Sequence, residues 1–372
     1  MNVMMIPFRM LQNRIFNIVG DRVYKITLAI TFLCNSKCSI CNIWRIYSEN
    51  PEKLNEELSK EKIIELFDEI GKDLLWIEIT GGEPFLKDDL EEIVSYIYNN
   101  TGIFSGAITT NGLLTDRIEM CVRKILQKIP PKKKVIVGVS IDGLRDIYKM
   151  IRGVDGYDKS LNTFLKLRDI SSEYENLIPH IAYTISRYNA GNFSEFYEDL
   201  NKKYGIGIED FTFTLEHQAA FYGIKPSGKA ERFYESFRSK VMRDISYIIN
   251  RLRREENRPR GLLQKIRKSF YLFYLNKIPE FISDPTKMII PCSAGKYSAY
   301  IDPYGTVYPC TMWDVPLGNI NIESFYDIWN SEKSREVRRL IKSGRCPVCW
   351  TPCEAQPSWI LSLDLLKGLF RI

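Results

Sequence analysis

The chain has 372 residues, of which 45% are hydrophobic and 26% are charged. This composition is typical of a globular protein and excludes a disordered or collagen-like chain. No apolar run reaches the roughly 18 residues that a membrane-spanning helix needs. Arg9 and Arg14 interrupt the apolar N-terminal stretch, which therefore lacks the pattern of an export signal. The sequence predicts a cytoplasmic protein, either soluble or peripheral on the inner face of the membrane.

Cysteines are the most informative residue type in this chain. A large protein without an export signal does not use them for disulfides, and only two histidines are present, so metal bound by thiolates is the economical interpretation. Cys121 stands alone on a helical pattern and is expected to be a small core residue. The other eight form groups: Cys34, Cys38 and Cys41; Cys292 and Cys310; Cys346, Cys349 and Cys353.

The net charge of +6 is unevenly spread along the chain. Residues 225–288 contain 16 Lys or Arg against 7 Asp or Glu. Such a basic segment indicates an anionic partner, namely a membrane surface, a phosphorylated substrate or a nucleic acid. The alternative is a solvated helical face with no partner.

From Val23 to Leu215, short β-like runs alternate with amphipathic helical stretches. Six βα units imply a parallel sheet with right-handed crossovers, flat or curved into a partial barrel. In such folds the chemistry gathers at the C-terminal ends of the strands. The expected strands span 24–32, 75–80, 105–109, 135–140, 179–185 and 210–214, and the expected helices 59–70, 90–98, 115–128, 159–168 and 193–204.

The pattern changes twice after the βα units. A charged helical stretch follows, and from Pro291 short strands and a turn at Asp302–Gly305 accompany the last five cysteines. The predicted organisation is an amphipathic N-terminal lead, an α/β partial barrel, a basic helical segment, and a small cysteine-rich α+β domain with an amphipathic tail. Their expected ranges are 1–22, 23–215, 216–288 and 289–372.

The first cysteine group directly follows the first expected strand. The C-x3-C-x2-C spacing from Cys34 to Cys41 brings three thiolates into one small volume, and three soft ligands suit an iron–sulfur cluster. A [4Fe–4S] cluster with three cysteines keeps one iron open for a small chelating molecule. The alternative, a zinc site, would call for a nearby histidine or carboxylate.

Polar residues and glycines follow the next three expected strands. Glycines allow the backbone to approach a ligand, and the Glu83 carboxylate can meet an ammonium group. Asn111 offers polar atoms to a sugar hydroxyl, and Ser140 with Arg152 can hold a carboxylate. Together the candidate ligand-binding residues are Gly81, Gly82, Glu83, Asn111, Ser140 and Arg152.

With these motifs in order over about 190 residues, the chain resembles the radical S-adenosylmethionine (SAM) enzymes. The matching elements are the Cys34–Cys41 loop, the GGEP sequence at Gly81–Pro84 and the SIDG sequence at Ser140–Gly143. The resemblance implies a partial (β/α)6 TIM-like barrel in which the open iron of a [4Fe–4S] cluster binds SAM. An electron from a small ferredoxin- or flavodoxin-type protein then cleaves SAM to a 5′-deoxyadenosyl radical, which takes a hydrogen atom from the substrate. The resemblance also implies that Gly81–Glu83 meet the methionine amine, Asn111 the ribose, and Ser140 with Arg152 the carboxylate.

The second cysteine group predicts a four-thiolate site, and for an isolated module zinc would be the default metal. This region resembles the SPASM/twitch auxiliary-cluster domains of radical SAM enzymes. It departs from a full SPASM domain, which carries seven cysteines and two clusters, so the resemblance implies one auxiliary [4Fe–4S] cluster. The expected ligands are Cys292, Cys310, Cys346 and Cys349, with Cys353 as either the true fourth ligand or a spare thiol.

The substrate is less well determined by the sequence. Residues 4–19, residues 261–278 and the tail from Trp359 mix large apolar residues with Arg or Lys, as helices in a membrane interface do. The leading hypothesis is therefore modification of a membrane lipid, in a head group or an isoprenoid chain, as in calditol-type lipid synthesis. Packing of these segments in the protein interior is the alternative.

Three other functions stay open at this stage. The first is radical modification of a ribosomal peptide or protein side chain. A nucleic-acid modifier is disfavoured, because no RNA-binding module is recognisable, and a non-catalytic iron–sulfur redox protein would need no SAM pocket. Glu216 and His217 follow the sixth strand, where they could move a proton for catalysis or cap the strand.

Overall fold

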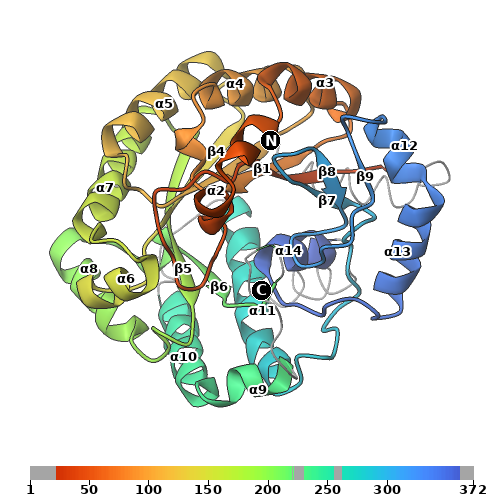
Figure 1. Ribbon diagram of the computed structural model, residues 1–372. Helices are drawn as coiled ribbons and strands as arrows, with labels where there is room; N and C mark the ends of the chain where they lie inside the picture. The colour runs from red at the N-terminus through yellow and green to blue at the C-terminus, as the bar shows by residue number, and fades with distance from the viewer. Residues whose placement is uncertain (1–21, 220, 222–229, 255–261, 361–372) are drawn as a thin grey trace.

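The computed structural model describes residues 22–219, 221, 230–254 and 262–360 (Figure 1). The described strands form one sheet of nine strands in the order β6-β5-β4-β3-β2-β1-β7-β8-β9, in which β1 to β7 are parallel and β8 and β9 antiparallel. The strands are β1 (Lys25–Thr31), β2 (Trp76–Gly81), β3 (Ser105–Thr110), β4 (Lys134–Ser140), β5 (Leu177–Ile185), β6 (Phe211–Leu215), β7 (Ser298–Ile301), β8 (Thr306–Tyr308) and β9 (Gly318–Asn319).

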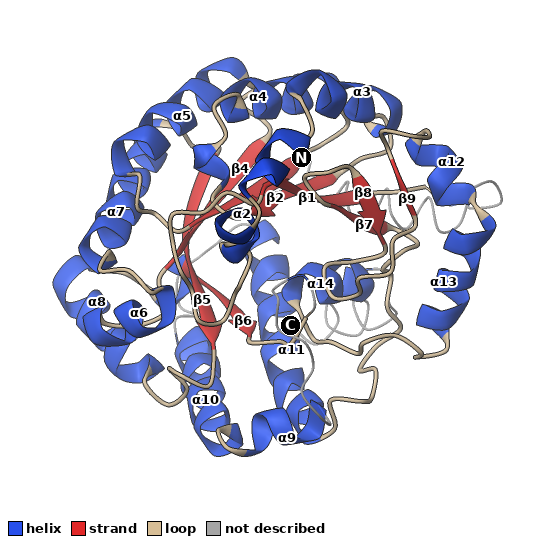
Figure 2. Cartoon of the chain, in the orientation of Figure 1, coloured by secondary structure: helices blue, strands red, loops and turns tan. Residues whose placement is uncertain are grey.

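Helices cover the outside of the curved sheet and close the space between its two edges. Figures 1 and 2 show α3, α4, α5, α7 and α8 around the convex face, while α11 and α14 lie between β6 and β7–β9, and α10 packs against α8 and α11. The helices are α2 (Arg45–Glu49), α3 (Lys60–Ile70), α4 (Leu90–Asn100), α5 (Thr115–Lys128), α6 (Arg145–Arg152), α7 (Tyr157–Glu173), α8 (Phe193–Tyr204), α9 (Ala230–Glu235), α10 (Arg238–Arg254), α11 (Leu262–Ser283), α12 (Phe325–Asn330), α13 (Glu332–Lys342) and α14 (Pro352–Ile360). The predicted partial barrel is confirmed, and each of its six strands begins and ends within two residues of the expected position.

Alternation along β1 shows why these residues form a barrel strand. Ile26, Leu28 and Ile30 are fully buried on one face of the sheet, and Lys25 and Thr27 alternate with them on the other. Because successive side chains of a strand point to opposite faces, the aliphatic set packs under the helices while the polar set faces the interior of the barrel.

The cysteine-rich region does not form a sheet of its own. Its first strand, β7, pairs in parallel with β1, so that Lys25 lies beside Ser298 and Leu28 beside Ile301. The turn expected at Asp302–Gly305 joins β7 to β8, and Asp302 Oδ1 accepts hydrogen bonds from the backbone of Tyr304 and Thr306. The two cysteine groups are therefore attached to opposite ends of one continuous sheet segment.

The basic-aromatic segment is a packing helix over its described side chains. Phe270, Tyr274 and Ile278 of α11 are buried, and the Tyr274 ring stacks on Trp350 with centroids 5.6 Å apart. This face is occupied by the protein itself, so the expected membrane-interface role does not hold for it. The other two segments of that hypothesis, residues 4–19 and the tail beyond Ile360, lie outside the described residues. No described helix is long and apolar enough to cross a bilayer.

A buried ion pair joins the barrel interior to the cysteine-rich region. Lys25 Nζ lies 3.2 Å from Glu78 Oε2 and donates to the backbone oxygen of Cys353. Burial alone would lower the pKa of Lys25, but the negative charge of Glu78 and its other acidic neighbours raises it above the usual value. Thr27 also donates to Glu78, at 3.1 Å.

Removal of one partner of this pair has a predictable cost. Replacing Lys25 by Met leaves the Glu78 charge buried without its cation, which should lower the free energy of unfolding by about 3–5 kcal/mol. Urea unfolding of the cluster-free chain, followed by tryptophan fluorescence, measures the loss.

Two controls separate the buried pair from a general effect of losing a lysine. The double variant Lys25→Met with Glu78→Leu should recover much of the stability, because no unpaired charge remains. Lys60→Met, which breaks the solvent-exposed pair with Glu92, should leave the unfolding midpoint nearly unchanged. Equal losses in Lys25→Met and Lys60→Met would contradict the role given to the buried pair.

Candidate active site

The C-terminal ends of the parallel strands surround a cavity of about 230 Å³. All three thiols of the loop after β1, those of Cys34, Cys38 and Cys41, line this cavity. The other strands contribute residues at or next to their C-terminal ends: Thr80, Thr110, Ser140, Thr184 and Thr214. The predicted gathering of functional groups at this edge of the sheet therefore exists as one cavity.

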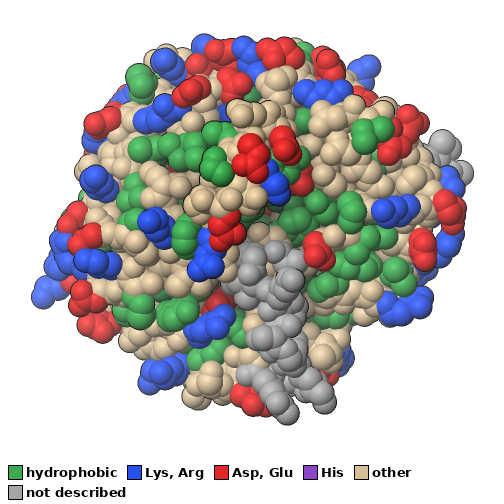
Figure 3. Space-filling model, in the orientation of Figure 1, with side chains coloured by type: hydrophobic (Ala, Val, Ile, Leu, Met, Phe, Trp, Pro, Cys, Tyr) green, Lys and Arg blue, Asp and Glu red, His purple; other side chains and the backbone are tan. Residues whose placement is uncertain are grey.

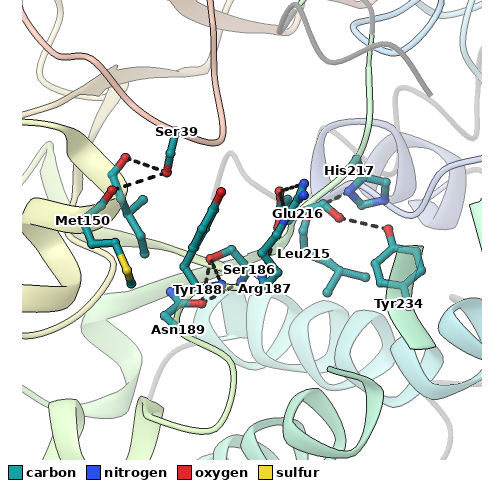
Figure 4. Close-up of polar contacts among 11 residues, drawn as sticks. Ser39, Met150, Ser186, Arg187, Tyr188, Asn189, Leu215, Glu216, His217 and Tyr234 are labelled. Carbon is teal, nitrogen blue, oxygen red and sulfur yellow. Dashed lines mark hydrogen bonds and ion pairs between the residues drawn. The ribbon is translucent and has the colours of Figure 1, made fainter. Parts of the chain in front are cut away.

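The end of α6 holds the cysteine loop in place. The Lys37 amide donates to the Arg152 carbonyl at 3.0 Å, and the Ser39 amide donates to the Ile151 carbonyl at 2.8 Å. Figure 4 shows the Ser39 hydroxyl pointing at the backbone carbonyls of the same turn, which include that of Met150. Because α6 ends at Arg152, the turn that fixes the loop also places the Arg152 side chain beside the cavity.

Arg152 lines the cavity and carries a buried donor that has no partner among the described residues. Its guanidinium is buried, forms an ion pair with Asp142, and has Nη1 3.8 Å from Cys38 Sγ. Arg152 Nε has no hydrogen-bond partner among the described residues, and neither has the buried Ser36 hydroxyl, which also lines the cavity. Buried donors of this kind call for a partner, and a ligand carboxylate is the group that suits a guanidinium.

Gly81 and Gly82 line the cavity with backbone atoms. A Cβ atom at Gly81 would lie 2.1 Å from the Thr31 carbonyl oxygen, and one at Gly82 would lie 2.2 Å from that of Leu33. The Gly82 amide donates to the Thr31 carbonyl at 2.7 Å. Glycine is therefore required at both positions because the end of β2 packs closely against the end of β1. The absence of side chains also leaves the backbone accessible to a ligand.

Glu83 lies behind the cavity wall rather than in it. Its carboxylate accepts hydrogen bonds from the Thr110 hydroxyl at 2.8 Å, the Asn111 amide at 2.7 Å and the Phe85 amide at 3.2 Å. Burial raises the pKa of Glu83 to about 7, while these donors favour the ionised form. The carboxylate thus orients the end of β3. Neither of its oxygens faces the cavity, and the expected contact of Glu83 with a ligand ammonium stays a prediction.

Asn111 and Ser140 do reach the cavity. Asn111 Nδ2 donates to Asn35 Oδ1 at 2.6 Å, and its Oδ1 accepts from the Leu113 amide at 3.0 Å. The Asn111 amide is thereby held in one orientation across the cysteine loop. Ser140 is buried at the end of β4. Both positions suit the ligand contacts expected of them, and those contacts stay predictions.

The thiols need a positive partner to ionise. Burial raises the pKa of Cys34 to about 11 and that of Cys41 to about 12. At neutral pH these side chains are protonated unless iron holds them as thiolates. Among the described residues, no three His, Cys, Asp or Glu side chains lie close enough together to bind a single metal ion. The thiols instead surround cavities, which is the arrangement that a larger iron–sulfur cluster requires.

A second cavity brings together the later cysteines. Cys292, Cys310, Cys346 and Cys349 line it, together with Glu354. Cys353 is absent from its wall. Burial and the nearby Glu78 raise the pKa of the Cys353 thiol, and Lys25 opposes the rise, so this thiol lies at the ion pair inside the barrel. The geometry therefore groups the four favoured ligands and separates Cys353 from them.

Glu216 faces the cavity but its carboxylate is already paired. Oε1 accepts from Arg187 Nη2 at 2.6 Å and Nε at 3.1 Å, and Oε2 accepts from the Arg187 amide at 3.0 Å. The Tyr234 hydroxyl donates to the Glu216 carbonyl at 2.9 Å, as Figure 4 shows. Glu216 therefore ties the end of β6 to the loop after β5, which is a holding role and not that of a free proton carrier.

His217 is likewise engaged on both ring nitrogens. Nδ1 donates to the Leu215 carbonyl at 2.6 Å (Figure 4), and Nε2 accepts from the Trp350 amide at 3.0 Å. The ring also packs on Phe281 with centroids 5.4 Å apart. Burial lowers the pKa of His217 to about 4, so the ring is neutral at pH 7. This arrangement supports the interpretation that His217 caps the end of β6. The same ring also binds the backbone of Trp350, 133 residues further along the chain.

Several cavity residues escaped the sequence-based prediction. Ser36 lies inside the C-x3-C loop, and Met312 and Thr351 come from the cysteine-rich region. Only Ser36 and Thr351 carried a signal, since each lies next to or between clustered cysteines. The participation of Met312 and Thr351 shows that the cysteine-rich region completes the cavity of the barrel.

An open parallel barrel, a three-thiol cavity at its strand ends and a second four-thiol cavity define a class of iron–sulfur protein. Two family models match this chain: the Radical SAM superfamily over residues 28–200, and an iron–sulfur cluster-binding domain, SPASM, over residues 292–354. The chain belongs to the radical SAM superfamily and carries a SPASM domain. It is an enzyme of that superfamily, with SAM and [4Fe–4S] clusters as its cofactors.

Similar proteins include two from Bacillus subtilis and one from Mycolicibacterium smegmatis. The sporulation killing factor maturation protein SkfB is 25% identical over 86% of this chain and 68% of its own length. The antilisterial bacteriocin subtilosin biosynthesis protein AlbA is 25% identical over 82% of this chain. Mycofactocin maturase MftC is 24% identical over 87% of this chain and 74% of its own length. The chain spans 59% of the length of AlbA, so the match leaves a large part of that relative uncovered.

Solved structures share the fold at low sequence identity. Streptococcus suis SuiB bound to S-adenosylmethionine superposes with a TM-score of 0.55 at 16% identity, covering 88% of this chain and 70% of SuiB. The protein anSMEcpe with bound AdoMet has a TM-score of 0.57 at 17% identity, covering 86% of this chain and 80% of that chain. These structures therefore share the fold of this chain over most of its length.

The first cysteine group should be essential for SAM cleavage. Replacing Cys38 by Ala removes the buried thiol of the three and should abolish formation of 5′-deoxyadenosine under reducing conditions. Chromatography of the quenched reaction with dithionite and SAM measures this product. Cys121→Ala is the matched control, because Cys121 lines neither cavity, and it should keep wild-type cleavage. Release of 5′-deoxyadenosine by Cys38→Ala at the wild-type rate would contradict the site.

His217 should make stability depend on pH. Its folded-state pKa of about 4 lies below the unfolded value near 6.5, so the folded state favours the neutral ring. The stabilisation is complete above pH 6.5 and is lost as the pH falls towards 4, by up to about 3 kcal/mol. Urea unfolding of the cluster-free chain at several pH values measures it. His217→Gln should remove this part of the pH dependence, and an unchanged pH profile in that variant would refute the assignment.

Proposed function

We propose that this enzyme modifies a ribosomally made peptide by radical chemistry. The observation that carries the proposal is the similarity, over more than four fifths of this chain, to proteins named for maturation or bacteriocin biosynthesis. Because these matches cover 82–87% of this chain, the similarity extends beyond the barrel. Two structures with the same fold were solved with peptides bound, SuiB with its precursor peptide SuiA and anSMEcpe with a peptide named Cp18Cys.

Lipid modification, the hypothesis favoured by the sequence, finds no support among these relatives. Its structural basis is also weakened, because the described part of the basic-aromatic segment packs its rings against Trp350 and Trp359. The hypothesis of a non-catalytic iron–sulfur protein is dropped because the chain belongs to a superfamily of enzymes. Peptide modification is the function that the relatives support best.

The roles proposed for the residues of the first cavity follow from their positions. Cys34, Cys38 and Cys41 would hold a [4Fe–4S] cluster, which with bound SAM would supply the radical that removes a hydrogen atom from the substrate. The ion pair with Asp142 fixes the Arg152 guanidinium, whose free Nε, with Ser140, receives a carboxylate.

Backbone and amide groups complete the proposed ligand contacts. The exposed backbone of Gly81 and Gly82 faces the ligand amine, and Asn111 faces the ribose. Glu83 acts indirectly, because it fixes the Asn111 amide from behind. These groups bind and orient the ligand.

Two further parts of the proposal concern electrons. Cys292, Cys310, Cys346 and Cys349 hold an auxiliary [4Fe–4S] cluster that, with four cysteine ligands, leaves no iron open for substrate. A small ferredoxin- or flavodoxin-type protein supplies the electron that the chemistry consumes.

Co-expression tests the proposed function directly. The wild-type enzyme, produced together with each short peptide encoded beside its gene, should change the mass of one peptide at one residue, as read by tandem mass spectrometry. Cys38→Ala should leave that peptide unmodified. Cys310→Ala should still form 5′-deoxyadenosine but yield no modified peptide, because the first cavity keeps its thiols while the second loses one.

Two results would contradict the proposal. One is that every neighbouring peptide keeps its encoded mass in the presence of an enzyme that cleaves SAM. The other is that Cys310→Ala modifies the peptide as fast as the wild type does, which would remove the second cavity from the reaction.

A further inference from the structure

One carboxylate oxygen binds the chain on both sides of the first cysteine group. Before the group, Glu57 Oε1 accepts from the Thr31 hydroxyl at 2.6 Å and from the Phe32 amide at 2.9 Å. After the group, the same oxygen accepts from the Tyr47 hydroxyl at 2.6 Å. Glu57 therefore closes the segment from Thr31 to Tyr47, which carries all three thiols of the first cavity, into a loop.

This contact extends to the residue that precedes the first thiol. The Thr31 hydroxyl, which donates to Glu57, accepts from the Leu33 amide at 2.9 Å. The Leu33 carbonyl in turn accepts from the Glu83 amide at 2.8 Å, just after the end of β2. The backbone directly before Cys34 is thus bound from two sides.

The position of Glu57 is itself fixed by other parts of the chain. Its side chain is 6% exposed, and Oε2 lies 3.5 Å from Lys87 Nζ, which also donates to the Leu58 carbonyl at 3.1 Å. The Leu58 amide donates to the Pro303 carbonyl at 2.7 Å, in the turn between β7 and β8. The acceptor of the loop contacts is therefore preorganised.

A carboxylate suits this position better than a neutral acceptor. Three donors share Oε1, and hydrogen bonds to an ionised acceptor are about twice as strong as those between neutral groups. Burial and the Glu57 carboxylate raise the pKa of Tyr47 above its usual value, so the Tyr47 hydroxyl keeps its proton and donates. Because Phe32 and Tyr47 belong to one buried apolar cluster, removal of Glu57 leaves buried donors unpaired, which costs more than a bond contributes.

We propose that Glu57 is a positioning residue for the SAM-binding cluster, because it fixes both ends of the loop that supplies the three thiols. Glu57 lines neither cavity, so it acts through the loop and not on a ligand. The backbone of α6 binds the middle of the loop at Lys37 and Ser39, which leaves the two ends to Glu57. This role rests on the part of the proposed function that assigns a cluster to the first cysteine group, and it is independent of the substrate.

Loss of iron from the reduced, anaerobic holoenzyme to the ferrous chelator bathophenanthroline disulfonate tests this role. Iron leaves through locally opened forms of the chain, so the rate follows their population. Glu57→Ala should release about four of about eight irons roughly tenfold faster than the wild type does, the effect of one hydrogen bond to a charged group. The irons of the second cavity should leave at the wild-type rate.

Two variants separate the geometry of these bonds from charge and from general stability. Glu57→Gln keeps an oxygen that can accept the same bonds, so its iron should leave close to the wild-type rate. Glu69→Ala removes a carboxylate that accepts from the backbone amides of Phe325 and Tyr326, at 3.0 and 2.8 Å, in α12. This matched control should also release iron as the wild type does.

A double-mutant cycle tests whether the Tyr47 end of the loop is bound through Glu57. Tyr47→Phe keeps the ring and should accelerate release less than Glu57→Ala does, because the other two bonds to Oε1 remain. In the Glu57→Ala background, Tyr47→Phe should add nothing, because the shared acceptor is already absent. If Glu57→Ala does not fold, Tyr47→Phe and Glu57→Gln carry the test.

Three outcomes overturn the positioning role. The first is a wild-type rate of iron release in Tyr47→Phe or in a folded Glu57→Ala. The second is a Glu57→Gln variant that releases iron about tenfold faster than the wild type, which would assign the effect to charge. The third is faster release from both cavities, or from Glu69→Ala as well, which would show a general loss of stability. Failure to modify any neighbouring peptide would overturn the proposed substrate alone, because no step of this test uses a peptide.

Discussion

The arrangement of both sites depends on the pairing of one strand, β1, with two partners. On one side β1 pairs with β2, and on the other it pairs in parallel with β7. The cysteine loop extends from the C-terminal end of β1, and β7 leads into the turn before Cys310. Because hydrogen-bonded strands lie about 4.8 Å apart, this pairing joins the elements that carry the two cysteine groups into one sheet, although more than 250 residues separate the groups in the chain. A barrel whose β1 had a free edge would hold only the first site.

Side-chain contacts reinforce this pairing at both ends of the barrel interior. Lys25 connects Glu78 of β2 to the Cys353 carbonyl, and His217 connects the end of β6 to the Trp350 amide. Both partners in the cysteine-rich region lie in or beside the segment from Cys349 to Cys353. That segment is therefore fixed from two sides, and its residues divide among three environments: Cys349 in the second cavity, Thr351 in the first, and Cys353 at the ion pair.

Much of this structure follows from local sequence patterns. The six barrel strands were expected within two residues of their positions, since alternating β-branched runs and turn residues are local signals. The thiols of the first cavity were predicted for the same reason, because a C-x3-C-x2-C spacing confines them whatever the fold does elsewhere. Gly81, Gly82, Asn111, Ser140 and Arg152 also line the cavity as the order of strand ends predicted.

The features that the sequence did not reveal depend on long-range contacts. Nothing near β7 indicates that it pairs with β1, and the Glu83 carboxylate faces away from the cavity because donors of Thr110 and Asn111 surround it. The composition of α11 fits a membrane-interface helix and a packed helix equally well. Its contacts with Trp350 and Trp359, which are distant in sequence, show that it is packed. Cys353 shares a short motif with Cys349, yet the turn into α14 directs it to Lys25.

The central claim is that seven thiols form one set of three and one set of four, with Cys353 in neither. Iron and sulfide analysis with Mössbauer spectroscopy, on anaerobically purified protein, tests it most directly. The wild type should hold two [4Fe–4S] clusters, about eight iron atoms per chain. The triple variant Cys34→Ala, Cys38→Ala, Cys41→Ala should hold about four, and Cys353→Ala should keep all of them. Loss of a cluster in Cys353→Ala, or loss of both in the triple variant, would contradict the division of thiols.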